Sequence, residues 1–98
     1  MYIARDIFHI HFGSFKNVLP SFRSAVSQNL FPMEHTRILT DFTGESYRLI
    51  IEMQFNTLAE YETMLTQGMK DPAWQVWYEG FKPHVKSSYR EILKKIDL

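Results

Sequence analysis

The sequence contains no cysteine among its 98 residues. That absence excludes a disulfide framework, a thiolate nucleophile, a zinc finger and an iron–sulfur centre, and it is compatible with a reducing compartment. An excess of one charge is also missing, because 11 Lys and Arg balance 11 Asp and Glu when the histidines are neutral. The molecule as a whole is therefore not attracted to nucleic acid or to an anionic lipid surface. We expect neither nucleic acid nor a membrane as a partner.

Long hydrophobic runs and linker-like segments are absent as well. No run of about 18 apolar residues occurs, so no membrane span is predicted. Arg5 and Asp6 place charge too close to the first residue for a signal peptide or a transit peptide. Gly and Pro, four of each, stand singly rather than in a linker. We expect one domain, residues 1–98, with one core and a cytoplasmic location.

Apolar and aromatic residues are plentiful, at 45% and 15% of the chain, and this composition is typical of a folded protein. Alternation predicts a strand over residues 2–12 that Gly13 ends. One face of this strand carries Phe8, Ile10 and Phe12, and the opposite face carries Arg5, Ile7, His9 and His11. Apolar residues spaced by three and four over 15–30 predict an amphipathic helix, with Ser14 as its N-cap and a bend or division at Pro20.

The rest of the chain continues with strands and helices of similar length. A weaker strand over 35–42 and the strongest strand, over 47–55, are joined by a short connection that contains Gly44, and 88–97 is expected to be an edge strand. A capping box at Thr57–Glu60 predicts a helix start. The pair Asp71–Pro72 predicts a second start, before a stripe of aromatic residues, Trp74, Trp77, Tyr78 and Phe81.

The order of these elements predicts the fold. Strand, helix, strand, strand, helix in two pieces and strand is the order of the ferredoxin-like βαββαβ sandwich, an α+β fold with a four-stranded antiparallel sheet and helices on one face. The strands 2–12 and 47–55 are expected side by side at the centre. The face without helices mixes polar with apolar side chains. That mixture suits a two-fold partner whose sheet lies across it and encloses a cavity.

Two segments resemble a known superfamily, the dimeric α+β barrels. These are the first strand, which carries Arg5 and ends at Gly13, and the helix start at residues 71–75 before the aromatic run. The chain resembles most the NIPSNAP-like and antibiotic-biosynthesis-monooxygenase-like groups, over essentially its whole length. The resemblance implies a homodimer with a shared cavity. Because superfamily members include cofactor-independent monooxygenases, haem-degrading enzymes, isomerase-like proteins and proteins with no assigned activity, it implies a cavity more than a reaction.

The comparison with haem-degrading members does not extend to their functional residues. When the chain is aligned with those members on the helix start at residues 71–74, Trp74 takes the place of a packing aromatic and Tyr78 lies near the family's histidine. The first strand has no asparagine. We therefore expect no haem and no other cofactor. Trp74, Trp77 and Tyr78 are candidates to line a ligand pocket, although a stripe at this spacing is also what any helix packed on a sheet displays.

His9 and His11 are the candidate catalytic residues. On a regular strand their imidazoles share one face about 7 Å apart, a spacing that one metal ion bridges, with Glu52 as a third ligand if the strand register allows. Three interpretations stay open: a metal site, a catalytic or ligand contact inside a barrel, and hydrogen-bonded interior histidines. No metal is expected, because the sequence does not fix a third ligand. As a base, either imidazole titrates near neutrality, and Glu52 could orient it.

The remaining candidates for ligand binding are polar residues of the same face. Arg48 and Arg5 would hold an anionic oxygen of a substrate, and Glu52 and Gln54 lie beside them on the predicted strand. The competing interpretation is a salt-linked sheet face at a dimer interface.

The sequence thus predicts a small homodimeric barrel protein that binds a small, partly apolar molecule. Its activity, if it is catalytic, would be that of a cofactor-independent monooxygenase or isomerase with a histidine base. The alternative is a non-catalytic module for binding or for oligomerisation.

Overall fold

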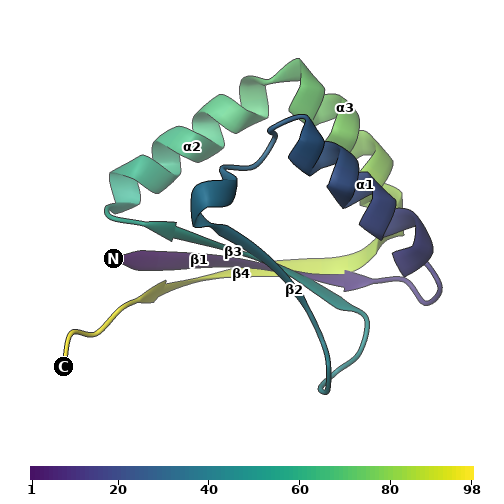
Figure 1. The fold of residues 1–98 in the computed structure, drawn as a ribbon, viewed down its shortest axis with the longest axis horizontal. Helices are drawn as coiled ribbons and strands as arrows, with labels where there is room; N and C mark the ends of the chain where they lie inside the picture. Colours follow the sequence, from purple (N-terminus) through teal and green to yellow (C-terminus); the bar gives the residue numbers. More distant parts are fainter.

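The computed structural model describes the whole chain, residues 1–98, as a four-stranded sheet covered on one face by helices (Figure 1). The elements in chain order are β1 (Tyr2–Ile10), α1 (Phe15–Ser27), β2 (Thr36–Thr40), β3 (Arg48–Phe55), α2 (Leu58–Lys70), α3 (Pro72–Phe81) and β4 (Val85–Lys94). Two short 3₁₀ helices, η1 (Met33–His35) and η2 (Lys82–His84), precede β2 and β4. The predicted α+β fold and its order of elements are confirmed.

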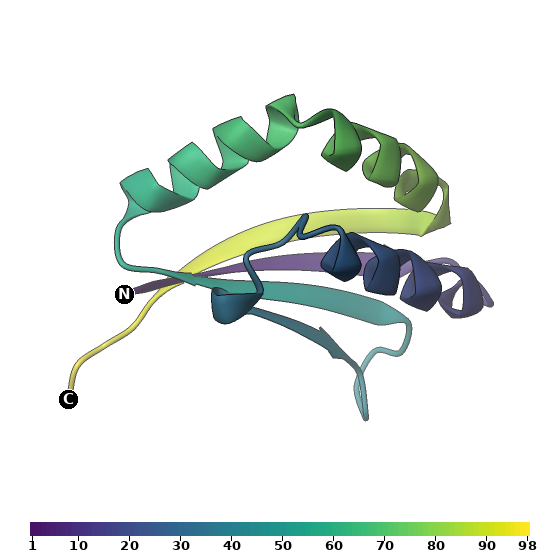
Figure 2. The ribbon, with the colours of Figure 1, turned by 45° about the horizontal axis from the view of Figure 1, so that its top comes forward.

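The sheet is antiparallel with the strand order β2-β3-β1-β4, so the two strongest strands lie at its centre as expected. Figures 1 and 2 show all three helices on one side of the sheet, with α2 and α3 forming an arch across it. We call the side without helices the open face. No helix is long and apolar enough to cross a bilayer.

The core lies between the sheet and the helices, and aromatic rings fill most of it. Phe22 of α1 is its centre, because its ring contacts the rings of Phe31, Trp77 and Phe81 at centroid distances of 5.7, 5.1 and 5.2 Å. The indole nitrogen of Trp77 donates to the carbonyl of Ser21 at 2.9 Å, which ties α3 to α1. These rings, together with aliphatic side chains such as Val18, Leu49 and Ile51, supply the apolar burial that favours folding.

The helix starts follow the capping signals of the sequence in part. Thr57 accepts a hydrogen bond from the backbone of Glu60 at 3.2 Å, and Asp71 accepts one from the backbone of Ala73 at 2.9 Å. Ser14 is the N-cap of α1 but makes no side-chain cap. The helix α1 is continuous through Pro20, so this proline does not divide it.

The end of β1 differs from the prediction. The strand ends at Ile10 instead of residue 12, because its register with β4 shifts between His9 and Ile10 and the backbone of His11 donates to the carbonyl of His84. The alternation of faces therefore stops before Phe12. The expectation that Phe12 joins the helix-covered face is wrong, since 87% of this residue is exposed.

Tyr61 of α2 is the one buried side chain that leaves a polar atom without a hydrogen-bond partner. Its ring packs edge-on against Phe55 at 5.0 Å, and the guanidinium of Arg90 lies over it at 5.6 Å. Arg90 is itself paired with Asp6 of the neighbouring strand. Burial and the charge of Asp6 raise the pKa of Tyr61, whereas Arg90 lowers it. The phenol therefore stays neutral and unpartnered.

We predict that Tyr61→Phe raises the free energy of unfolding by about 1 kcal/mol, because it removes an unsatisfied buried hydroxyl and keeps the ring. Urea denaturation followed by circular dichroism measures the change. Tyr78→Phe is the matched control, since Tyr78 of α3 is exposed and lies away from the open face, and it should show no effect. A loss of stability in Tyr61→Phe would contradict the prediction.

Candidate functional site: the open face of the sheet

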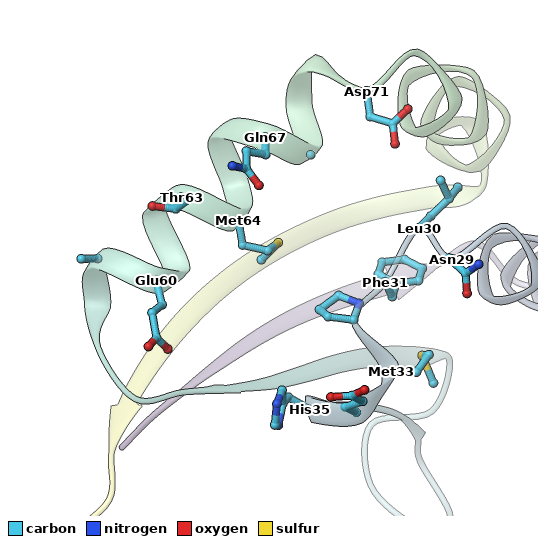
Figure 3. A pocket seen from close by; sticks show the side chains of 14 residues that line it. Asn29, Leu30, Phe31, Met33, His35, Glu60, Thr63, Met64, Gln67 and Asp71 are labelled. Atoms are coloured by element: carbon cyan, nitrogen blue, oxygen red, sulfur yellow. The ribbon is translucent and has the colours of Figure 1, made fainter.

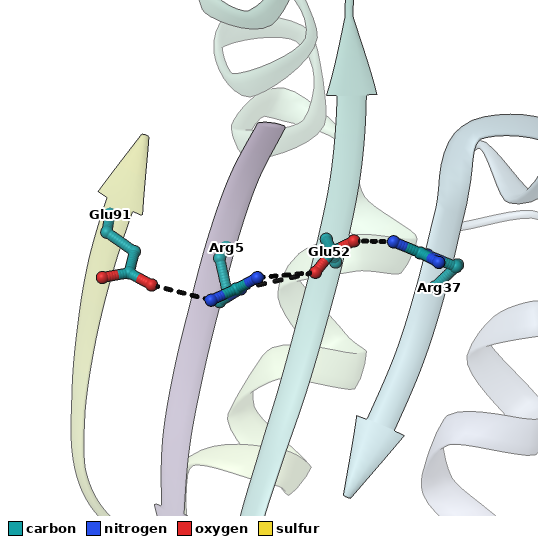
Figure 4. A network of polar contacts seen from close by, with 4 residues as sticks. All are labelled: Arg5, Arg37, Glu52 and Glu91. Carbon is teal, nitrogen blue, oxygen red and sulfur yellow. Dashed lines mark hydrogen bonds and ion pairs between the residues drawn. The ribbon is translucent and has the colours of Figure 1, made fainter. Parts of the chain in front are cut away.

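Four charged side chains form a row across the open face, one from each strand (Figure 4). The strand register places Glu91 of β4 opposite Arg5 of β1, Arg5 opposite Glu52 of β3, and Glu52 opposite Arg37 of β2. The signs alternate along the sheet. We call these four residues the charged row.

Hydrogen bonds join each member of the charged row to its neighbours. Arg5 donates through Nε and Nη2 to Oε2 of Glu52 at 3.3 and 3.2 Å, and through Nη1 to Oε1 of Glu91 at 3.1 Å. Arg37 donates to the other carboxylate oxygen of Glu52. Both oxygens of Glu52 are therefore occupied, and only 4% of this side chain is exposed.

Glu52 is ionised in spite of its burial. Burial alone would raise its pKa, but the hydrogen bonds from Arg37 and Arg5 outweigh that effect and hold the pKa of this carboxyl below its ordinary value. The sequence suggested that Glu52 orients a histidine or ligates a metal. The structure shows it neutralised by two arginines instead.

Mainly apolar side chains flank the charged row on both sides. The row on one side consists of Tyr89, Ile7, Ile50 and Leu39, and that on the other side of Leu93, Ile3 and Gln54. Ile7 is buried by its neighbours, whereas the edge residues Leu39, Tyr89 and Leu93 are exposed. The open face thus presents a charged row between two mainly apolar rows, and its exposed apolar side chains lie at the two edges.

His9 and Arg48 lie at the end of this face, beside the connection between β2 and β3. Nε2 of His9 is 3.8 Å from a carboxylate oxygen of Glu45, and its ring stacks on Tyr89 at 6.3 Å. Arg48 donates through Nε and Nη2 to Asp41, with a closest approach of 2.7 Å. This contact lowers the pKa of Asp41. The charge of Arg48 is therefore already balanced within the chain.

His11 does not share the position of His9. It follows the last residue of β1 and is exposed, so the expected pair of imidazoles on one strand face is not formed. No group of three or more His, Asp or Glu side chains is placed to hold a metal ion. Of the two histidines, only His9 lies on the open face.

The aromatic candidates lie on the opposite side of the sheet. Trp77 is buried in the core, and Trp74 packs on it at 5.1 Å and on Phe31 at 5.7 Å. Tyr78 is more exposed and stacks on Trp74 at 6.0 Å. The structure therefore brings Arg5, Glu52 and Gln54 together with His9 and Arg48 on one face. It separates Trp74, Trp77 and Tyr78 from them by the thickness of the sheet.

A second hollow lies in the helical layer, between α2 and residues 29–35 (Figure 3). This groove has a volume of about 990 Å³. Its walls include Met64 and Gln67 of α2 and, opposite them, Phe31 and Met33. It continues into a smaller cavity of about 410 Å³ that shares Met64 and His35. The carboxylates at its rim, Glu60 and Asp71, accept backbone hydrogen bonds at helix starts.

The contacts of several residues of the open face could not be predicted from sequence patterns. Arg37 and Glu91 lie within the predicted strands 35–42 and 88–97, but only the strand register places them beside Glu52 and Arg5. Asp41 and Glu45 belong to the connection between strands, where no periodicity exists to indicate a direction. The only sequence signal for the contacts of Arg48 is that Asp41 and Glu45 precede it closely in the chain.

No protein family and no curated protein matches the sequence, but solved structures match nearly the whole chain. A NIPSNAP family protein from Agrobacterium tumefaciens is 16% identical with a TM-score of 0.89, covering 98% of this chain and 86% of its own. An uncharacterised NIPSNAP domain protein from Burkholderia xenovorans is 13% identical with a TM-score of 0.84, covering 98% and 95%. The chain has their ferredoxin-like fold.

The ferredoxin-like fold also relates this chain to a second group. A candidate antibiotic biosynthesis monooxygenase from Nitrosomonas europaea is 10% identical with a TM-score of 0.73, covering 99% of this chain and 100% of its own. The resemblance predicted from the sequence, to NIPSNAP-like and monooxygenase-like proteins, is confirmed at the level of the fold. At this identity the comparison carries the fold and no residue's role.

We predict that Glu52→Gln lowers the free energy of unfolding at pH 7 by roughly 1–3 kcal/mol, because it leaves Arg5 and Arg37 without their shared counter-charge. Since the folded-state pKa of Glu52 is depressed, its stabilising effect is complete above the unfolded value of about 4.3 and disappears as the pH falls through the folded value. The difference between wild type and variant should therefore shrink below about pH 4. Denaturation curves at pH 7 and pH 3 measure it, and an equal difference at both would contradict this role.

Proposed function

We propose that the chain is a homodimer formed through the open face, whose two sheets enclose a small, partly apolar molecule. The charged row carries this proposal. An alternating row with an even number of charges matches itself after a two-fold rotation, so the face is complementary to a second copy of the same chain.

The charge pattern selects one of two ways to stack the sheets. A two-fold axis parallel to the strands sets β2 of one copy opposite β4 of the other. Arg37 then faces the partner's Glu91, and Arg5 faces the partner's Glu52. An axis perpendicular to the strands would instead set each charge opposite an identical charge, which is repulsive. The first arrangement also keeps the strands of the two sheets nearly aligned, as in common sheet packings.

The apolar rows supply the driving force for this association. Stacking the faces removes Leu39, Tyr89 and Leu93 from water, and burial of apolar surface is the main favourable term in most protein association. Charges already satisfied within each chain add register and specificity rather than affinity.

The space between the sheets suits a small ligand of mixed character. On the two central strands Ile3, Ile7 and Ile50 lie on either side of the paired Arg5 and Glu52, and His9 and Gln54 stand beside them. Predominantly apolar walls with a few polar groups are typical of small-molecule sites. The groove beside α2 is a separate hollow and forms no part of this interior.

A catalytic function is the second candidate, and the contact between His9 and Glu45 favours it. A carboxylate 3.8 Å from Nε2 is placed to orient the imidazole, which could then remove a proton from a carbon acid. The predicted role of Arg48 and Arg5 as holders of a substrate oxyanion would draw on groups already paired with Asp41 and Glu52. The reaction would be that of a cofactor-independent monooxygenase or isomerase. A module for binding or oligomerisation without catalysis is the alternative.

The absence of cysteine makes the proposed axis directly testable. Leu39→Cys and Tyr89→Cys are single variants at exposed positions of the same apolar row. When the two variants are mixed and treated with a bismaleimide that spans about 10 Å, the distance between stacked sheets, we expect a cross-linked dimer on a denaturing gel. Leu39→Cys alone is the control and should stay monomeric on that gel. Cross-linking of the control, or no cross-linking in the mixture, would refute the axis.

Native mass spectrometry of the purified protein tests the contents of the barrel. We expect a dimer that carries a reproducible extra mass, since a cavity with apolar walls retains its ligand. His9→Ala should reduce the retained mass without dissociating the dimer, because His9 faces the interior and lies outside the charged row. A bare monomer would exclude the shared cavity, and a bare wild-type dimer would exclude a retained ligand.

A further inference from the structure

The groove between α2 and residues 29–35 has the size of a small-molecule site (Figure 3). Its volume is about 990 Å³, and the adjoining cavity adds about 410 Å³. Clefts that bind small molecules measure roughly 300–1,000 Å³. Figure 3 shows Met64 and Asp71 directed from the helices toward the segment 29–35. The groove is therefore a hollow into which side chains of both walls point.

The inner surface of the groove is apolar. Met64 forms it on the side of α2, and Leu30, Phe31 and Met33 form it on the opposite side. Phe31 is buried and held in place by an edge contact with Trp74 at 5.7 Å. Leu30 and Met64 are half-buried, so part of each is open to a ligand. Methionine side chains adapt to apolar groups of different shapes. This surface suits a hydrocarbon chain or an aromatic ring.

Apart from His35, the ionisable side chains that line the groove are all acidic. They are Glu34 of η1, Glu60 of α2 and Asp71 between α2 and α3, and no lysine or arginine accompanies them. Six of the 11 acidic residues in the chain form ion pairs. Of the five that do not, three are these. The groove thus gathers carboxylates that have no counter-charge in the chain.

The hydrogen bonds of these carboxylates leave oxygen atoms free for a ligand. Glu60 accepts from the backbone of Asn56 through Oε2, and Asp71 accepts from the backbone of Ala73 through Oδ1. Oε1 of Glu60 and Oδ2 of Asp71 receive no hydrogen bond from the chain, and Glu34 receives none at either oxygen. Each carboxylate can therefore accept a hydrogen bond from a bound molecule.

Two helix C-termini add negative potential at the Asp71 end of the groove. The helix α1 ends at Ser27, two residues before Asn29, and α2 ends directly before Asp71. The last carbonyl groups of a helix carry a partial negative charge. No basic residue stands in the last turn of α1, and Lys70, in the last turn of α2, does not line the groove. This end of the groove favours a cation.

We propose that the groove binds an organic cation, an ammonium group attached to an apolar body. The apolar body lies between Leu30 and Met64, and the ammonium group donates to the carboxylates at the rim. An anionic ligand would be repelled by those carboxylates, and a neutral ligand would leave them without a counter-charge. The site lies on the helix-covered side of the sheet. It depends neither on the proposed dimer nor on its interior.

A matched set of probes tests the site in a titration followed by the amide signals in NMR spectra. 4-Phenylbutylamine, 4-phenylbutanol and 4-phenylbutyrate share one apolar body and are cationic, neutral and anionic. At pH 7 and low salt we expect the amine to bind about fivefold more tightly than the alcohol or better, and the carboxylate to bind most weakly. The shifted signals should centre on residues 29–35 and 59–68. An amine that binds no more tightly than the alcohol, or shifts centred on the open face, would overturn the proposal.

Charge-removing variants assign the effect to the groove. Glu34→Gln should weaken binding of the amine by about two- to fivefold and leave binding of the alcohol unchanged. Asp71→Asn should do the same with the fold intact, because asparagine caps a helix as well as aspartate does. Glu62→Gln is the matched control, since Glu62 is an exposed, unpaired acidic residue of α2 that does not line the groove. Equal effects of Glu34→Gln and Glu62→Gln would indicate general surface charge and overturn the site.

Discussion

The burial of one carboxylate between two arginines organises the open face of this protein. Glu52 stands on a central strand, where a single ionised group would be too costly to keep from water. Arg5 and Arg37 approach it from the two neighbouring strands, and their hydrogen bonds hold its pKa below the ordinary value against the opposing effect of burial. Glu91 then neutralises the far side of Arg5. Since the four residues are directly opposite each other, any shift of strand register would leave Glu52 uncompensated.

In the proposed dimer, the same arrangement makes the open face complementary to a second copy. A face that is neutral overall, alternates in sign and is flanked by apolar rows repels neither a second copy nor an uncharged ligand. The face also limits chemistry, because Arg5 and Arg48 already balance carboxylates of their own chain. His9 also lies on this face, on β1, and is not part of the charged row. Both interpretations of the face, ligand binding and proton transfer, therefore depend on His9, which lies beside Glu45.

The two sides of the sheet serve different purposes. On the helix-covered side, Phe22, Trp77 and Phe81 fill the core, and the stripe of aromatic residues on α3 is mainly packing. The groove between α2 and residues 29–35 is the principal hollow on that side. On the other side the strands present polar and apolar bands. A layer of helices stabilises the sheet, and the face left uncovered is available for function.

The sequence by itself determined the order of the elements, the central position of the two strongest strands and most of the face assignments. These follow from local physics: alternation at Phe8 and Ile10, capping at Thr57 and Asp71, and the spacing of Phe22 with its neighbours on α1. Only the tertiary structure decided which charges meet. Arg37, Glu52, Arg5 and Glu91 are far apart in the chain, and their pairing depends on a register that no local pattern specifies. The shift at His9 and Ile10 likewise ended β1 early and separated His11 from His9, because a strand end is set by its neighbours and by hydrogen bonds from distant residues.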